Sequence, residues 1–200
     1  MEDTLFDKWL HRLRVTATIV YIVALCLAVA VLVIAFIPHS TITAAVPATD
    51  VPGLDAISGL PAGVTVDSAS TLAVKIAEPS VAQRLLYLVA VVPGLALVAV
   101  IASRMAKLLR AALASDPFTA PTVRALTALA KITAVGGIAV WAMSNLATWA
   151  LSATVLDGAS TPQPHEAAAL AWLAVALIFA TFGQLIARGV AMRAELDTVI

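Results

Sequence analysis

The chain has 200 residues, of which 62% are hydrophobic and 12% are charged, and its mean hydropathy is +1.00. Soluble domains have about 45–50% apolar and about 25% charged residues, so the composition excludes a soluble enzyme or binding module and indicates an integral membrane protein. The formal net charge is zero, and we expect no direct binding of nucleic acid.

Four long apolar runs set the predicted architecture. Each is close to or above the roughly 20 residues that span a bilayer, and together they predict helices near 15–37, 85–114, 120–155 and 167–194. The sequence therefore predicts an all-α membrane protein, a four-transmembrane-helix bundle that forms a single integral membrane domain over residues 1–200. The single cysteine, Cys26, lies in the first run, where we expect a buried packing role.

The loop over residues 38–83 contains two segments rich in β-branched residues. They cover 63–66 and 71–76 and flank a polar segment, 67–70, with turn chemistry. This pattern predicts a small β-hairpin. Since an isolated two-stranded hairpin is marginal in water, we expect it to pack on the helix ends.

The second and third helices contain polar or irregular positions within the membrane. Pro93-Gly94 frees a carbonyl and predicts a kink in the second helix. In the third, Ser144 and Thr148 are four residues apart, and Asn145 lies beside them. Two interpretations stay open: close helix packing through interhelical hydrogen bonds, or an intramembrane polar pocket around Asn145 to which Tyr21 of the first helix also contributes.

A polar, proline-containing break separates the second and third helices. Pro117 lacks an N–H and disfavours helical geometry at Asp116, so the second helix must end there. The third helix can begin at once, because the Thr119 hydroxyl can accept from the N–H of Thr122 and Pro121 falls in the first turn.

We expect this break to hold the two helical hairpins in register. Phe118 would fill a groove between the helix ends, and Asp116 would pair with an arginine. The candidate partners of Asp116 are Arg124, Arg188 and Arg193.

Basic residues are distributed unevenly along the chain. If both termini and the central break share one side of the membrane, ten of the twelve lysines and arginines lie on that side, and only Lys75 and Arg84 lie on the other. The positive-inside rule then predicts that the termini and the break are cytoplasmic. Among the ten, Arg104, Lys107 and Arg110 share one helix face, which can contact anionic lipid head groups or dock an acidic soluble partner.

The sequence offers little for catalysis. It contains no GxSxG, HExxH, phosphate-loop or SxxK motif and no Cys/His zinc pattern. No acidic residue lies inside an apolar run, which argues against a proton pump or ion-coupled transporter. We therefore predict no catalytic residue, no metal and no cofactor.

Two segments resemble a known pattern. Asp116-Pro117-Phe118-Thr119, with Val123-Arg124-Ala125-Leu126 after it, resembles the "PFT…N-x-R-x-L" segment of a large family of uncharacterised bacterial four-helix membrane proteins. The tail from Arg188 through Arg193 and Glu195 to Asp197 resembles that family's closing "R-G-x-x-L-R-x-E-x-D" pattern. The chain departs from the family at Thr122 and Met192, where asparagine and leucine are common.

The resemblance implies a bacterial cytoplasmic membrane protein of unestablished activity, often encoded beside a small helix-turn-helix regulator of the Xre type. We expect a non-enzymatic membrane sensor or anchor whose cytoplasmic face engages a small soluble partner, such as a transcriptional regulator. One alternative is a membrane-embedded enzyme or enzyme subunit that modifies a hydrophobic peptide or lipid, for example in a modified-peptide biosynthetic pathway. Another is a transport or immunity protein against a membrane-active peptide.

Overall fold

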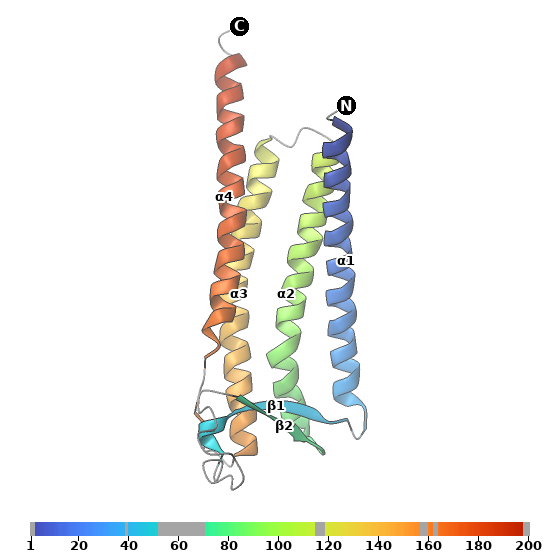
Figure 1. The fold of residues 1–200 in the computed structure, drawn as a ribbon, viewed down its shortest axis with the longest axis vertical. Coiled ribbons are helices and arrows are strands. Elements are labelled where there is room, and N and C mark those ends of the chain that lie inside the picture. Colours follow the sequence, from blue (N-terminus) through green and yellow to red (C-terminus); the bar gives the residue numbers. More distant parts are fainter. Residues whose placement is uncertain are drawn as a thin grey trace, which may run out of the picture. The chain divides into compact units, whose positions relative to one another are not determined.

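The computed structural model describes residues 3–38, 40–51, 71–114, 119–156, 160–161 and 164–197. Four long apolar helices form a bundle, and a two-stranded antiparallel sheet lies between the first two in the chain (Figure 1). In chain order the elements are α1 (Asp3–Phe36), β1 (Ile42–Pro47), the 3-10 helix η1 (Ala48–Asp50), β2 (Thr71–Ile76), α2 (Val81–Ala114), α3 (Ala120–Val155) and α4 (Glu166–Asp197).

Every helix is long and apolar enough to cross a membrane. The candidate spans contain 29, 34, 36 and 28 residues, whereas about 20 residues cross the hydrocarbon core. The chain is therefore a multi-pass membrane protein, and the predicted four-helix fold is confirmed.

The chain divides into two compact units. The first, here called the terminal unit, comprises residues 1–28, 94–141 and 166–200; the second, the sheet unit, comprises 29–93 and 142–165. On α2 the division falls between Pro93 and Gly94. The predicted irregular position on α2 thus coincides with the limit of a unit.

Burial on α1 follows a seven-residue repeat in which the most buried side chains are small. On α1 the buried positions Ala24, Ala28 and Ala35 lie on one stripe with the half-buried Tyr21 and Val31. Steps of three and four residues give the period of 3.5 that is typical of knobs-into-holes packing. In membranes, small residues on such a stripe let neighbouring backbones approach closely.

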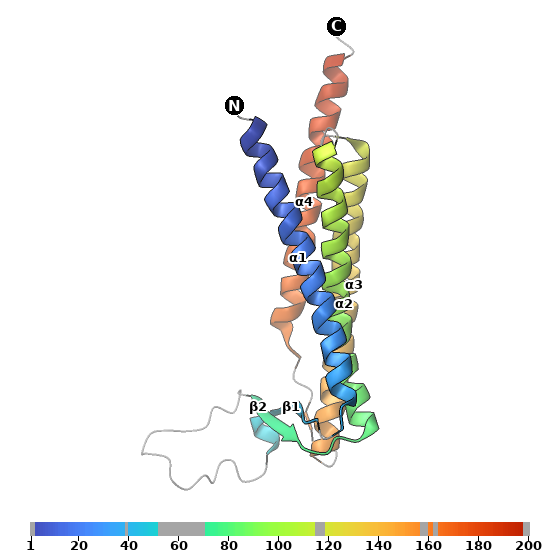
Figure 2. The ribbon, with the colours of Figure 1, turned by 90° about the vertical axis from the view of Figure 1, so that its right-hand side faces the viewer.

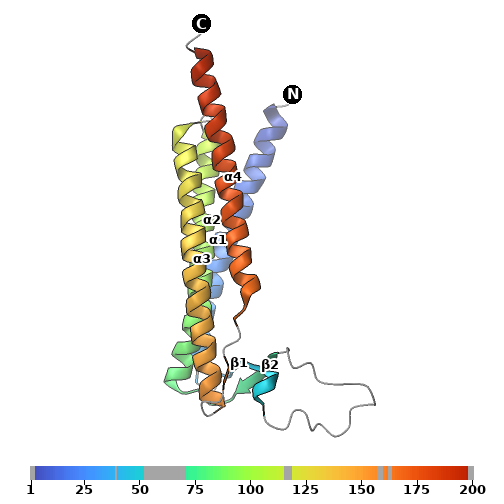
Figure 3. The same cartoon turned by 90° about the vertical axis from the view of Figure 1, so that its left-hand side faces the viewer.

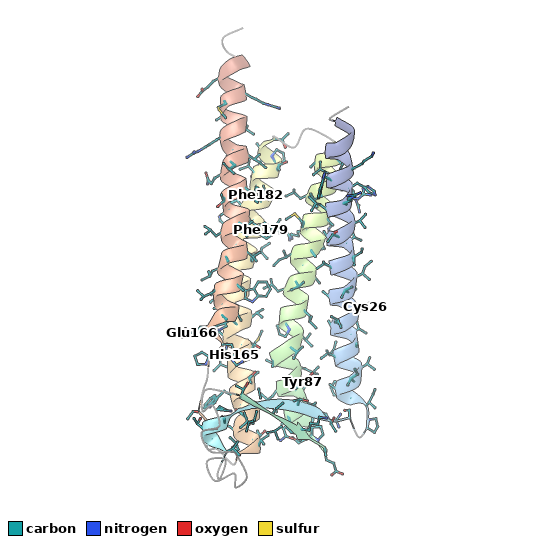
Figure 4. The ribbon with its side chains drawn as sticks, viewed as in Figure 1. Cys26, Tyr87, His165, Glu166, Phe179 and Phe182 are labelled. Carbon is teal, nitrogen blue, oxygen red and sulfur yellow. The ribbon has the colours of Figure 1, made fainter. Side chains whose placement is uncertain are left out.

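From residue 19 to residue 36 the remaining surface of α1 is apolar and exposed, Cys26 included. Leu25 is 46% exposed and Leu27 is 50% exposed, as expected for side chains that face lipid. Cys26 is exposed as well (Figure 4). The expectation of a buried cysteine was therefore wrong, because position 26 lies opposite the stripe of Ala24 and Ala28.

In the terminal unit, glycines bring α3 against its neighbours. A Cβ atom on Gly136 would lie 2.9 Å from Leu97 Cδ1 of α2, and one on Gly137 would lie 2.5 Å from Trp172 Cβ of α4. Figure 3 shows α3 and α4 side by side over this region. Close packing is thus present at Gly136-Gly137, with one glycine turned to each neighbouring helix.

Four helix ends meet at one end of the terminal unit, here called the terminal end. The start of α1, the end of α2, the start of α3 and the end of α4 all lie there (Figure 1). The predicted common location of both termini and the central break agrees with this arrangement.

In the sheet unit, β1 and β2 pair in antiparallel register from Ile42↔Ile76 to Pro47↔Thr71 (Figure 2). Ile42, Ala44 and Val46 point to one side of β1 and form a core with Leu151 of α3. The sheet thus rests on helix ends, as predicted. Of the two predicted strands, 71–76 is confirmed. Its partner is β1 rather than the expected segment 63–66, which lies outside the described residues.

Candidate functional site

Both ends of the connection from α1 to α2 in the sheet unit are capped by side chains. Ser80 and Gln83 form a capping box at the start of α2: Gln83 N donates to Ser80 Oγ over 3.3 Å, and Ser80 N donates to Gln83 Oε1 over 2.9 Å. Gln83 Nε2 also donates to Thr154 Oγ1 of α3 over 3.2 Å. One glutamine thus starts α2 and ties it to α3.

Arg84 closes the carboxyl end of α1. Its Nη1 donates to the carbonyl oxygens of Ala35 and Ile37 and to Ser40 Oγ, and its Nε donates to Pro79 O. The last carbonyls of a helix lack intrahelical donors and carry partial negative charge, so a guanidinium satisfies both requirements. Arg84 is therefore a structural residue.

The predicted polar stripe on α3 has two separate roles. Ser144 Oγ donates to Ala90 O of α2 over 2.7 Å, an interhelical hydrogen bond of the kind that the packing interpretation expects. Ala90 lies one turn before Pro93, where the proline ring disturbs the helical ladder. Ser144 thereby ties α3 to the proline-containing part of α2.

The other face of the stripe holds the connection that leads to α4. Asn145 Oδ1 accepts from His165 N over 3.1 Å, and Trp149 Nε1 donates to Ser160 O over 3.0 Å. The hydroxyls of Ser152 and Ser160 lie 2.7 Å apart. Figure 4 shows His165 and Glu166 at the start of α4. Asn145 is therefore a residue that fixes a loop.

Asp50 joins the connection between α1 and α2 to the connection between α3 and α4. Asp50 Oδ2 accepts from Thr161 N over 2.6 Å, and Asp50 Oδ1 accepts from Thr161 Oγ1 over 2.9 Å. The backbone N–H of Thr161, with the hydroxyls of Thr161 and Thr49, holds the pKa of the Asp50 carboxyl below its ordinary value of 3.8. Hydrogen bonds to a carboxylate favour its charged form, so Asp50 stays ionised here.

A small polar pocket lies beside these bonds. Its volume is about 20 Å³, and its lining includes Asn145, Thr148, Ser152, Thr161 and His165. A volume of this size holds about one water molecule, whereas small-molecule sites occupy roughly 300–1,000 Å³. Of the residues predicted for a pocket, the structure brings Asn145 and Thr148 together. Ser144 instead contacts α2, and Tyr21 is half-buried on α1 in the terminal unit.

The terminal unit displays cations. Arg104, Lys107 and Arg110 are all exposed and recur every three residues along α2, which places them on neighbouring positions of one helix surface. The candidate arginines of the break and the tail, Arg124, Arg188 and Arg193, are exposed as well, as is Glu195 on α4.

The central break lies partly beyond what the structure describes. Asp116, Pro117 and Phe118 lie outside the described residues, so their predicted contacts stay predictions, and α4 ends at Asp197 without a described side chain there. At Thr119 the third helix begins as predicted, with α3 starting at Ala120. Thr119 O accepts from Val123 N over 3.2 Å, and the hydroxyls of Thr119 and Thr122 lie 3.1 Å apart.

Within the described ranges, no group of three or more His, Cys, Asp or Glu side chains that could hold a metal is present. The polar side chains that gather in the sheet unit serve instead to join α3, the sheet and the 160–165 connection. Their hydrogen bonds hold these segments together.

One family model, described as a protein of unknown function, DUF2975, matches residues 63–200. The chain belongs to the DUF2975 family. This agrees with the predicted membership of an uncharacterised family of four-helix membrane proteins. The DUF2975 match covers β2, α2, α3 and α4, together with the 115–118 break and the tail. No match was found among curated proteins or solved structures.

Sequence reasoning missed two structural residues of the sheet unit. Arg84 was counted only as a basic residue of a loop, and no local pattern shows that it caps a helix 49 positions away. The bond between Asp50 and Thr161 joins residues 111 positions apart. By contrast, the Ser80-Val81-Ala82-Gln83 capping box is a local signal that could have moved the predicted start of α2 from 85 to 81.

Proposed function

We propose that this DUF2975 protein is a non-enzymatic membrane sensor or anchor whose terminal end engages a small soluble partner through exposed cations. The observation that carries the proposal is the separation of charge between the two units. The terminal unit contains ten basic and seven acidic residues, a net charge of +3, whereas the sheet unit contains two basic and five acidic residues, a net charge of −3.

Three cations of α2 are exposed. Arg104, Lys107 and Arg110 are exposed on α2, close to the end of that helix at Ala114. In the sheet unit, by contrast, Arg84 is engaged in capping α1, and only Lys75 remains exposed. A surface with one sign of charge attracts a partner of the opposite sign and raises the rate of association.

The positive-inside rule places these cations in the cytoplasm, where a soluble partner can reach them. The resemblance to a family often encoded beside Xre-type helix-turn-helix regulators suggests such a regulator as the partner. This part of the proposal rests on genetic association in the family. The enzyme and transport alternatives receive less support, because the pocket at Asn145 holds about one water molecule.

The test uses the full-length protein in lipid nanodiscs and, as the candidate partner, a small Xre-type helix-turn-helix regulator from the same organism. Binding is measured by biolayer interferometry at low and high salt for the wild type and for the double variant Lys107→Glu/Arg110→Glu. We expect the variant to weaken binding about tenfold or more, equivalent to about 1.4 kcal/mol, and we expect salt to weaken wild-type binding.

The matched control is Lys75→Glu, which reverses an exposed cation on β2. It should leave binding unchanged, and thermal unfolding should show that all variants are folded. If the regulator does not bind, or if it binds Lys107→Glu/Arg110→Glu as tightly as wild type, the proposal is wrong.

A further inference from the structure

A groove of about 410 Å³ runs between α3 and α4 within the terminal unit. Four alanines make it concave, and its larger lining residues are Thr127, Lys131 and Gln184 together with Leu173 and Leu177. The volume lies within the roughly 300–1,000 Å³ of ligand sites in proteins. Both of its walls belong to candidate membrane spans.

The glycine contacts fix the relative level of the two helices along this groove. Gly183 of α4 faces Leu126 and Thr127, and Gly137 of α3 faces Trp172. Leu126 to Gly137 is eleven residues on α3, and Trp172 to Gly183 is eleven residues on α4, which corresponds to about 16 Å of helix. The helices therefore run antiparallel with the positions near 126 and 183 level with each other.

With this register, the groove changes character along its length. Gln184 and Thr127 are nearly level at the part closest to the terminal end, and Lys131 follows one turn further in. Leu177 is level with Lys131, and its Cα–Cβ bond tilts towards the N-terminus of α4, away from the terminal end. Leu173 lies one turn further towards the centre of the span. The groove is thus polar near the terminal end, cationic at Lys131 and apolar beyond it.

The cationic end continues beyond the groove. Arg124 lies seven residues before Lys131 on the same face of α3, and Arg188 lies one turn after Gln184 on the same face of α4. Both side chains are exposed. Among the described residues that line the groove, none is acidic, so nothing in the lining neutralises the ammonium group of Lys131.

We propose that this groove is a binding site for an anionic phospholipid, with the phosphate at Lys131 and an acyl chain along Leu177 and Leu173. A cation inside a candidate span is costly unless it finds a partner or reaches the interface. A phosphate group supplies that partner, and Gln184 and Thr127 offer hydrogen-bonding groups beside it. The order of groups in a phospholipid, phosphate first and hydrocarbon after it, matches the order of side chains along the groove.

Native mass spectrometry of the full-length protein tests the site. Protein purified in detergent is titrated with phosphatidylglycerol, which is anionic, and with phosphatidylcholine, which is zwitterionic. We expect the wild type to retain phosphatidylglycerol at least tenfold more strongly than phosphatidylcholine. Lys131→Gln should remove most of this preference, and Lys131→Arg should keep it because the positive charge remains.

Two matched pairs of variants separate the site from general effects. Lys8→Gln removes an exposed cation of α1 outside the groove and should leave the preference intact. Ala134→Leu fills the groove and should weaken retention of both lipids several-fold, whereas Ala139→Leu, at an exposed α3 position outside the groove, should not. Thermal unfolding of delipidated protein checks that each variant is folded.

Inorganic phosphate distinguishes the source of the ligand. At millimolar concentration it should not displace phosphatidylglycerol, because the acyl chain also contributes to binding. Displacement by phosphate alone would mean that the groove binds soluble anions and would overturn the lipid assignment. Equal retention of the two lipids, or full preference in Lys131→Gln, would overturn it as well. These outcomes are independent of whether a soluble partner binds Lys107 and Arg110.

Discussion

Arg84, Gln83 and Asp50 act on backbone groups that secondary structure leaves without partners. Arg84 donates to the last carbonyls of α1. Gln83 accepts from the N–H of Ser80, and Asp50 accepts from the N–H of Thr161. Helix ends and loops carry such groups, and a side chain that bonds to them replaces the missing backbone partner. The polar side chains of the sheet unit therefore have structural roles that do not require a ligand.

Asp50 makes the stability of the sheet unit dependent on pH. The pKa of its carboxyl is lowered from 3.8 by the Thr161 N–H and by two hydroxyls. A lowered pKa in the folded state means that the stabilisation is present above 3.8 and is lost as pH falls through the still lower folded value. As pH falls from about 4 to about 2.5 in detergent, we expect Asp50→Asn to lose less thermal stability than the wild type.

The measurement is a melting curve at each pH, and the readout is the difference in melting temperature between the wild type and Asp50→Asn. At pH 6 the wild type should be the more stable protein. A difference that stays constant down to pH 2.5 would show that the ionised carboxylate of Asp50 does not stabilise the fold.

At the scale of elements, small residues determine how closely the helices pack. Gly137→Ala would place a Cβ 2.5 Å from Trp172 Cβ, whereas Gly94→Ala would place one 3.7 Å from Val140 Cγ1, an ordinary contact. We expect Gly137→Ala to destabilise the protein by about 1–3 kcal/mol through overpacking. Gly94→Ala should be neutral or stabilising, since alanine favours a helix by about 0.5–1 kcal/mol over glycine.

Unfolding of both variants in detergent, by heat or by sodium dodecyl sulfate, compares the same chemical change at two positions. Equal stability of Gly137→Ala and Gly94→Ala would contradict the close approach of α3 and α4 at Trp172.

The elements differ in how far the sequence determines them. Apolar runs of bilayer length predict all four helices, because a membrane leaves few other ways to satisfy the backbone. The strand Thr71–Ile76 is visible from its β-branched residues, but β1 contains two adjacent alanines and ends in a proline, residues that are depleted in strands. The choice of its partner depends on the core formed with Leu151. Pairing across a long loop leaves no local signal.

The candidate sites show the same limit. Hydrophobicity does not separate buried from lipid-facing positions, which is why the burial of Cys26 was predicted wrongly. The stripe of Ser144, Asn145 and Thr148 was visible, but which of its members would face a loop depends on the connection at 160–165. Neither the groove at Lys131 nor the cap by Arg84 has a signature within one segment, because each joins distant parts of the chain.

At the scale of the molecule, the basic residues are distributed unevenly between the two units. The basic residues gather in the terminal unit, where the start of α1, the end of α2, the start of α3 and the end of α4 meet (Figure 1). Partner binding at Lys107 and Arg110 requires this end to face the cytoplasm. Orientation in the membrane is therefore the claim on which the proposed function depends most.

Single-cysteine labelling in intact cells measures this orientation directly. In a Cys26→Ala background, Thr43→Cys on β1 and Ala114→Cys at the end of α2 each introduce one exposed thiol. A membrane-impermeant maleimide should label Thr43→Cys in intact cells, and it should label Ala114→Cys only after the membrane is opened. Labelling of Ala114→Cys in intact cells, with Thr43→Cys protected, would reverse the orientation and contradict a cytoplasmic partner at the terminal end.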